Sequence, residues 1–232
     1  GALTIAAAVL SGTATVANFI ASGGISLSAV VLAGSALEKF AATGNLQRPA
    51  TVLSGAALEK FTSTGNLQVA ANVLSGAALE RFTSTGSINV VATILSGTAL
   101  ERFTATGNLQ RSATILSGAA LERFTSTGSI VLGAVVLSGT AMVGVTFTAS
   151  GGIVLSPVAL SGSALEKFAA TGALQTGAVV LSGTALERFT ATGSLQRPAT
   201  VLSGAALEKF AASGALAAGA AALAASGTIK FS

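Results

Sequence analysis

The chain has 232 residues, of which 51% are hydrophobic and 9% charged, with a formal net charge of +4. Because globular domains carry about 25% charged residues, we expect much of the apolar surface to be buried against other chains. Cys, His, Trp, Tyr and Asp are absent, and with them the side chains that nucleophilic triads and zinc or redox-metal sites require. The composition therefore predicts no enzymatic activity, no catalytic residue, no metal site and no cofactor.

The basic residues do not form an evident cluster in the sequence. Eight of them directly follow a glutamate, so the net charge comes from Arg48, Arg111, Arg197 and Lys230. Nucleic-acid binding needs clustered Lys and Arg, often beside aromatic platforms, and Phe is the only aromatic residue here. We therefore expect no nucleic-acid partner.

Two sets of glycines divide the chain from its N-terminal end onward. The first follows a Leu-Ser/Ala dipeptide and mostly recurs every 21 residues, at Gly12, Gly34, Gly55, Gly76, Gly97, Gly118, Gly139, Gly162, Gly183 and Gly204. The second falls near the middle of each unit, at Gly44, Gly65, Gly86, Gly107, Gly128, Gly172, Gly193 and Gly214. This pattern predicts one array over residues 1–232, with about ten repeats of two arms each.

The arm that follows the first glycine reads SGAALEKF at 54–61 and is ambiguous. As a helical turn it would pair Leu58 with Phe61; as a strand it would place Glu59 and Phe61 on one face and Leu58 and Lys60 on the other. Its divergent copies, GTATVANFIASGG and GTAMVGVTFTASGG, are rich in Thr, Val and Gly, a composition that favours strands over helices. Because repeats should share a backbone, we predict strands, with a short helix per repeat as the alternative.

The other arm reads NLQRPATVLS at 45–54 and alternates apolar with polar residues. Leu46, Ala50 and Val52 occupy the apolar positions, which predicts a half-buried strand with these side chains on the core face. Pro49 and Pro198 interrupt two copies on the more polar face, so these points should be unpaired or at an edge.

The uncharged run at 124–165 is apolar enough to resemble a membrane helix. It nevertheless keeps the glycine pattern of its neighbours, so we predict strands there and no membrane partner. A larger duplication at an offset of 128 relates Gly34 to Gly162 and their following GSALEKFAATG segments. The chain contains no composition break that would mark a separate tip or enzymatic domain.

Stacking the repeats about 4.8 Å apart would place identical side chains in columns. Two glutamates at that distance repel by about 0.9 kcal/mol in water, and on a strand the adjacent basic residue points the other way. The sequence therefore predicts ion pairs between chains, with a solvated stripe that keeps the rod soluble as the alternative. The predicted interchain pairs involve Glu38, Lys39, Glu59, Lys60, Glu80, Arg81, Glu101, Arg102, Glu122, Arg123, Glu166, Lys167, Glu187, Arg188, Glu208 and Lys209. The predicted packing columns contain Leu37, Phe40, Leu58, Phe61, Leu79, Phe82, Leu100, Phe103, Leu121, Phe124, Leu165, Phe168, Leu186, Phe189, Leu207 and Phe210.

Tandem units such as SGTAL followed by FTATGSL give the whole chain a texture that resembles the repetitive shaft segments of bacteriophage tail-fibre and minor tail proteins. The resemblance implies a trimeric or otherwise intertwined, protease-resistant fibre that carries or spaces a receptor-binding tip. This chain departs from such fibres in having no distinct tip, no collagen-like run and no coiled-coil heptads.

Together these observations predict an all-β protein whose two-stranded repeats form an elongated β-solenoid or an intertwined, trimeric β-fibre. The expected function is a structural fibre component in a virion tail or on an extracellular surface. Its expected partners are copies of itself and other virion or surface structural proteins. The alternatives are an amyloid-like surface adhesin and a membrane-inserted β-barrel or pore.

Overall fold

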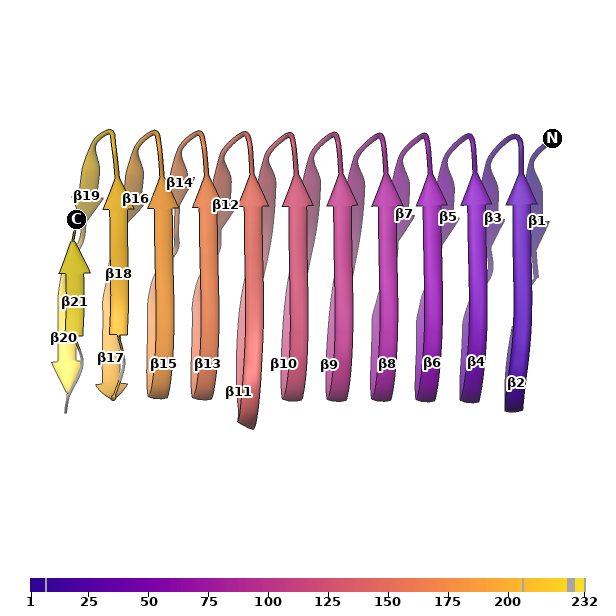
Figure 1. The fold of residues 1–232 in the computed structure, drawn as a ribbon, viewed down its shortest axis with the longest axis horizontal. Coiled ribbons are helices and arrows are strands. Elements are labelled where there is room, and N and C mark those ends of the chain that lie inside the picture. Colours follow the sequence, from indigo (N-terminus) through magenta and orange to yellow (C-terminus); the bar gives the residue numbers. More distant parts are fainter. Residues whose placement is uncertain (7, 206, 225–227, 232) are drawn as a thin grey trace.

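The computed structural model describes residues 1–6, 8–205, 207–224 and 228–231, and these residues form strands without any helix. Every strand pairs in parallel with its equivalents in the preceding and following repeats, so the chain winds into one β-solenoid (Figure 1). The predicted all-β solenoid of about 21-residue repeats is therefore confirmed. In the described part of the chain, no helix is long and apolar enough to cross a membrane.

In most coils of the solenoid, one long strand passes through both arms of the repeat. In the last coils, two shorter strands form the two arms. The long strands are β2 (Ala8–Ala21), β4 (Val30–Ala42), β6 (Thr51–Ser63), β8 (Asn72–Ser84), β9 (Ile88–Ala105), β10 (Leu109–Ser126), β11 (Ile130–Ala149), β13 (Val158–Ala170) and β15 (Val179–Ala191). The short strands are β1 (Leu3–Ile5), β3 (Ile25–Leu27), β5 (Leu46–Arg48), β7 (Leu67–Val69), β12 (Ile153–Leu155), β14 (Leu174–Gln175) and β16 (Leu195–Arg197). The last coils contain β17 (Thr200–Gly204), β18 (Leu207–Ala212), β19 (Leu216–Ala218), β20 (Ala221–Ala224) and β21 (Thr228–Phe231).

The coil is flattened into two layers, which we call the back arm (46–54 and its equivalents) and the front arm (56–63 and its equivalents). Figure 1 shows β17 descending behind and β18 rising in front, so the chain reverses between them. Gly55 makes the same reversal in its coil with a φ of 101°. A Cβ atom there would lie 2.6 Å from the carbonyl oxygen of Gly34 on the preceding coil, which explains why glycine recurs at this corner. Both arms are extended, as predicted, and the helical alternative for SGAALEKF is wrong.

The opposite corner is stabilised by polar side chains that repeat from coil to coil. The backbone N–H of Asn66 donates to Asn45 Oδ1 at 2.9 Å, and the N–H of Ser87 donates to Asn66 Oδ1 at 2.9 Å. The hydroxyl of Thr64 donates to the carbonyl oxygen of Thr43. These contacts satisfy backbone groups at the turn, where the strand ladder is interrupted.

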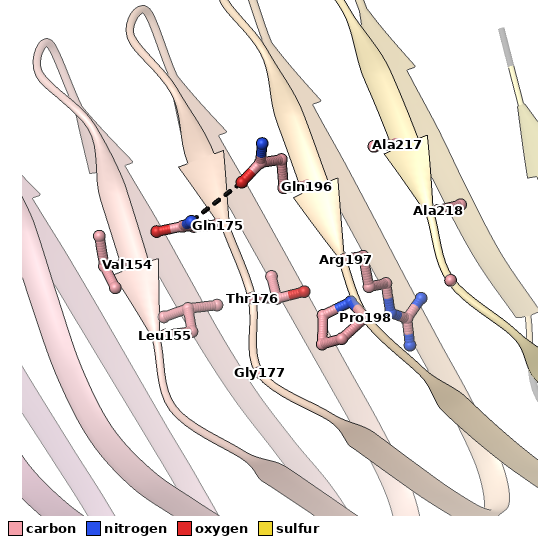
Figure 2. Close-up of a pocket in the computed structure, with 11 residues that line it drawn as sticks. Val154, Leu155, Gln175, Thr176, Gly177, Gln196, Arg197, Pro198, Ala217 and Ala218 are labelled. Carbon is pink, nitrogen blue, oxygen red and sulfur yellow. Dashed lines mark hydrogen bonds between the residues drawn. The ribbon is translucent and has the colours of Figure 1, made fainter.

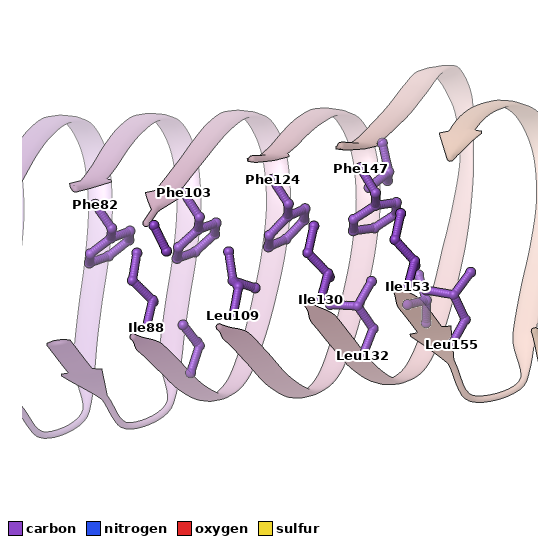
Figure 3. Close-up of a cluster of buried hydrophobic side chains, with 14 of the residues drawn as sticks. Phe82, Ile88, Phe103, Leu109, Phe124, Ile130, Leu132, Phe147, Ile153 and Leu155 are labelled. Atoms are coloured by element: carbon purple, nitrogen blue, oxygen red, sulfur yellow. The ribbon is translucent and has the colours of Figure 1, made fainter. Parts of the chain in front are cut away.

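The core between the two arms consists of side-chain columns that follow the strict register. Phe61 pairs with Phe40 on one side and Phe82 on the other, and successive Phe rings from Phe19 to Phe210 stack with centroids 4.8–5.0 Å apart. Figure 3 shows these rings facing aliphatic side chains of the back arm, such as Ile88 and Leu109. Each coil thus buries the same cluster against the next.

The back arm differs from its prediction at one point. Leu46 lies in the core, but Ala50 and Val52 lie on the outer surface, while Thr51 and Leu53 point inward. The cause is the break at residues 49–50 between β5 and β6, which shifts the alternation by one residue. Pro49 lies in this break, and Pro198 lies in the equivalent break between β16 and β17, where no strand requires the missing N–H.

Candidate functional site

Strand alternation sends the two members of each Glu-Lys/Arg pair to opposite faces of the front arm. Glu59 lies on the inward face with Phe61 and has no exposed surface, whereas Lys60 is exposed. All eight glutamates are at most 3% exposed. Since the sequence contains no Asp, every acidic side chain of the protein lies inside the solenoid.

Three arginines of the back arm supply the positive charge inside this core. Arg48, Arg111 and Arg197 are at most 4% exposed, and each forms ion pairs with glutamates of two consecutive coils. Arg48 Nη1 lies 3.0 Å from Glu80 Oε1, and its Nη2 lies 2.5 Å from Glu59 Oε2. The Arg48 guanidinium also lies 4.6 Å from the centre of the Phe61 ring.

The other two arginines repeat this arrangement. Arg111 Nη1 lies 2.7 Å from Glu122 Oε1 and 3.6 Å from Glu101 Oε2. Arg197 pairs with Glu208, and its Nη2 lies 3.7 Å from Glu187 Oε2. Each arginine therefore joins two coils across the interior as well as the two arms.

These contacts correct the expected role of the glutamates in interchain ion pairs. The carboxylates share the inward face with the Phe column, so their cations come from the back arm of the same chain. The sequence did contain a signal for this: Arg48, Arg111 and Arg197 are surplus to the Glu-Lys/Arg pairs and recur at one repeat position. Arg48 lies two residues after the inward-pointing Leu46 on the same strand, so its side chain also points inward.

Eight buried glutamates outnumber three buried arginines, and this imbalance affects their protonation. Burial raises the pKa of Glu38, Glu59, Glu101 and Glu187 above the ordinary carboxyl value, with nearby arginines opposing the rise. Burial raises the pKa of Glu166 to about 8, partly offset by a hydrogen bond with Glu187. No cation is among the groups that shift the pKa of Glu166, so its raised pKa favours the protonated carboxyl at neutral pH.

The basic partners of these glutamates form a single row on the outer surface of the front arm. We call this row the cationic ladder; it comprises Lys39, Lys60, Arg81, Arg102, Arg123, Lys167, Arg188 and Lys209. Six of the eight are exposed and two, Arg102 and Lys209, are half-buried. Strand register places them directly above one another, with one interruption at Thr146. The small net charge thus conceals a surface whose side-chain charges are all positive.

The predicted packing columns divide between the two faces. The eight Phe residues, from Phe40 to Phe210, lie in the core at no more than 3% exposure. The Leu residues lie outside, beside the cationic ladder; Leu58 and Leu121 are exposed and the other six are half-buried. A second aliphatic row on the outer back arm contains Val31, Val52, Ile94, Ile115, Val136, Val180 and Val201, each 37–47% exposed. We call it the aliphatic stripe.

Shallow grooves indent the outer back arm next to the breaks between short and long strands. The groove in Figure 2 has a volume of about 530 Å³ and lies between Val154 and Gly219. Gln175 Nε2 donates to Gln196 Oε1 at 2.9 Å across it, and Arg197 lies at its edge.

Comparisons with protein-family models, curated proteins and solved structures found no match to this chain. Across the described residues no cluster of potential metal ligands occurs.

Proposed function

We propose that this chain is a rigid, rod-forming structural module of a virion tail fibre or of a fibre on a cell surface. The observation that carries this proposal is the parallel pairing that continues from coil to coil between β1 and β21, with its Phe column at 4.8–5.0 Å. In such a one-dimensional stack each coil contacts its neighbours and adds a fixed increment of length. A rod of this kind suits a spacer.

The placement of reactive groups supports a structural role. Every carboxyl side chain is buried in the solenoid, where a substrate could reach it only if the coil opened. The outer faces present aliphatic, hydroxyl, amide and basic side chains in repeated rows. Rows of identical groups are suited to extended contacts, because each coil offers the same contact as the next.

Side-by-side association of rods would use the aliphatic stripe. The stripe provides one Val or Ile on most coils, and continuous apolar rows of this length are typical of interaction surfaces. The glutamates are unavailable for pairing between chains, so association would depend on aliphatic contacts. A bundle of three copies agrees with the resemblance to fibre shafts.

Changing the number of coils tests the spacer role. Deleting 66–86 removes 21 residues and joins equivalent positions of two coils, so the rod should remain folded and shorten by about 4.8 Å. Small-angle scattering with light-scattering mass measurement would record the length at a known oligomeric state. Deleting 66–76 is the control, since it removes the back arm and its corner glycine, leaves one front arm joined directly to the next, and should unfold the array. A compact particle, or an in-phase deletion that unfolds like its control, would contradict the proposal.

Charge placed on the aliphatic stripe tests association separately. Ile94→Lys with Ile115→Lys should convert any bundle to single rods, because lysine cannot be buried in an apolar contact without its charge being paired. Gln68→Lys with Gln110→Lys adds the same charge to the same arm away from the stripe and should leave the mass unchanged. Equal masses for the two variants would exclude the stripe as the contact.

A further inference from the structure

The solenoid places every glutamate in its core and eight of its basic residues in a row on the outer face, and this arrangement leaves a surface with an unmet electrostatic requirement. In the described residues, no ion pair involves any member of the cationic ladder; the ion pairs all join the internal arginines to glutamates. Like charges directly opposite on neighbouring strands repel. The ladder therefore needs an external anion, one that supplies charge at the interval of the coils.

The ladder is straight and evenly spaced. Its members occupy identical positions on consecutive strands, five before Thr146 and three after it, and the spacing of the adjoining Phe rings fixes the interval at 4.8–5.0 Å. Double-helical nucleic acid winds its phosphates away from such a line. Single-stranded nucleic acid prefers aromatic platforms, and the eight Phe residues beneath the ladder, Phe40 to Phe210, are buried.

Next to the ladder lies a surface suited to sugar rings. Leu165, Leu186 and Leu207, with Ser163 and Thr184, line a groove of about 360 Å³ along the front arm. These Leu residues lie two positions before Lys167, Arg188 and Lys209, on the same outer face. The groove thus combines aliphatic contact for a ring face with hydroxyls for hydrogen bonding, in line with a row of cations.

We propose that the front arm binds a linear acidic polysaccharide laid along the solenoid axis, with its carboxylates against the cationic ladder and its ring faces against the Leu row. An extended polymer of uronic acids fits because it carries one carboxylate per sugar and its successive sugars turn about the chain axis, so the carboxylates facing the cationic ladder would recur at a small multiple of the sugar repeat. The proposal is independent of the fibre role, since a rod could bind such a polymer whether or not it spaces a tip.

Polygalacturonate is a suitable probe, and titration of the full chain in low salt is the measurement. We expect binding that weakens steeply as salt is added, with dextran, a neutral polymer, failing to bind. Replacing Lys167, Arg188 and Lys209, the members of the cationic ladder beside the Leu groove, by Gln should weaken binding about tenfold or more, since each exposed pair contributes modestly. Circular dichroism of that variant would verify that the solenoid is intact.

A variant with tighter binding distinguishes recognition by the cationic ladder from attraction to the net positive charge. Thr146→Lys completes the row and should tighten binding about two- to fivefold, whereas Gln175→Lys adds the same charge on the back arm and should have a smaller effect. Equal gains from both variants, or polygalacturonate binding that survives the three Gln substitutions, would overturn the proposal. Tighter binding to duplex DNA, or to vesicles of phosphatidylcholine with phosphatidylglycerol, would also overturn it.

Discussion

The coil formed by β11 lacks the Glu-Lys/Arg pair of its neighbours but keeps their Phe column. Comparing it with them separates the residues that support the fold from those that carry charge. Where the preceding coil has Glu122 and Arg123, this coil has Val145 and Thr146. Val145 is 1% exposed, and Phe147 still stacks on the rings before and after it at 4.8 and 4.9 Å. The Phe column therefore continues through a coil that lacks the charge pair. The conformation of the coil does not depend on that pair.

The back arm changes together with the front arm in that coil. Leu132 occupies the position of Arg111, and Val135 occupies that of Thr114. Aliphatic residues at these two positions thus face Val145. The next coil keeps Leu155 and Val158 there although it carries the buried Glu166, so a glutamate does not always face a polar back arm. A buried charge requires a partner across the interior, and the β11 coil contains neither the charge nor a polar residue at these two positions.

The largest effect should follow loss of a Phe ring from either kind of coil. Phe103→Ala and Phe147→Ala should each lower the free energy of unfolding by about 3–5 kcal/mol, because both rings are at most 1% exposed and stack on two neighbours. Urea unfolding followed by circular dichroism would measure both. A much smaller loss of stability for Phe147→Ala would contradict the claim that the Phe column supports the charged and uncharged coils alike.

Removing a buried arginine should be next in size and confined to the charged coils. Arg111→Met should cost about 3 kcal/mol near neutral pH, since Glu101 and Glu122 would remain buried without their cation. Leu132→Met, at the same position of the uncharged coil, is the matched control and should cost less than about 1.5 kcal/mol. Adding Glu101→Gln and Glu122→Gln to Arg111→Met should recover most of the loss. If the arginine variant were as stable as its control, the internal ion pairs would be unimportant.

The raised pKa of Glu166 predicts a loss of stability as the pH rises from the ordinary carboxyl value to about 8. Below the ordinary carboxyl pKa both folded and unfolded chains hold the proton, so Glu166 costs nothing. Between that value and about 8, the unfolded chain releases the proton first, and the free energy of unfolding should fall by about 1.4 kcal/mol per pH unit. Glu166→Gln should reduce this slope, whereas Lys167→Gln, on the outer face, should keep it. Unfolding curves collected across the pH range would show the difference, and identical slopes would refute the assignment.

The smallest effect on stability is expected at the cationic ladder. Lys60→Gln should change the free energy of unfolding by less than about 0.5 kcal/mol, and in the stabilising direction, since it removes repulsion between exposed neighbours. Added salt should erase the gain. A loss above about 1 kcal/mol would mean that the ladder supports the fold, which the β11 coil argues against.

Much of the architecture could be predicted from the sequence, because the repeats record it redundantly. The divergent arms with Val145 and Thr146 identified both arms as strands, and the register of Glu59 over Glu80 followed from the 21-residue period. The direction in which Glu59 points could not be predicted from one arm alone. It depends on the other arm, where the break after Arg48 moves Val52 outward; Pro49 marks an interruption there, but the prolines do not show that the alternation shifts by one residue.

Chemical accessibility of the carboxyl groups most directly tests the central claim, which is that every acidic side chain is buried while the cationic ladder lies on the outer face. Carbodiimide coupling of the native chain, mapped by mass spectrometry, should leave all eight glutamates unmodified until the chain is unfolded. Acetylation under the same native conditions should modify Lys39, Lys60 and Lys167 rapidly, because these side chains are exposed. Glutamates that react in the native chain as readily as these lysines would contradict the account.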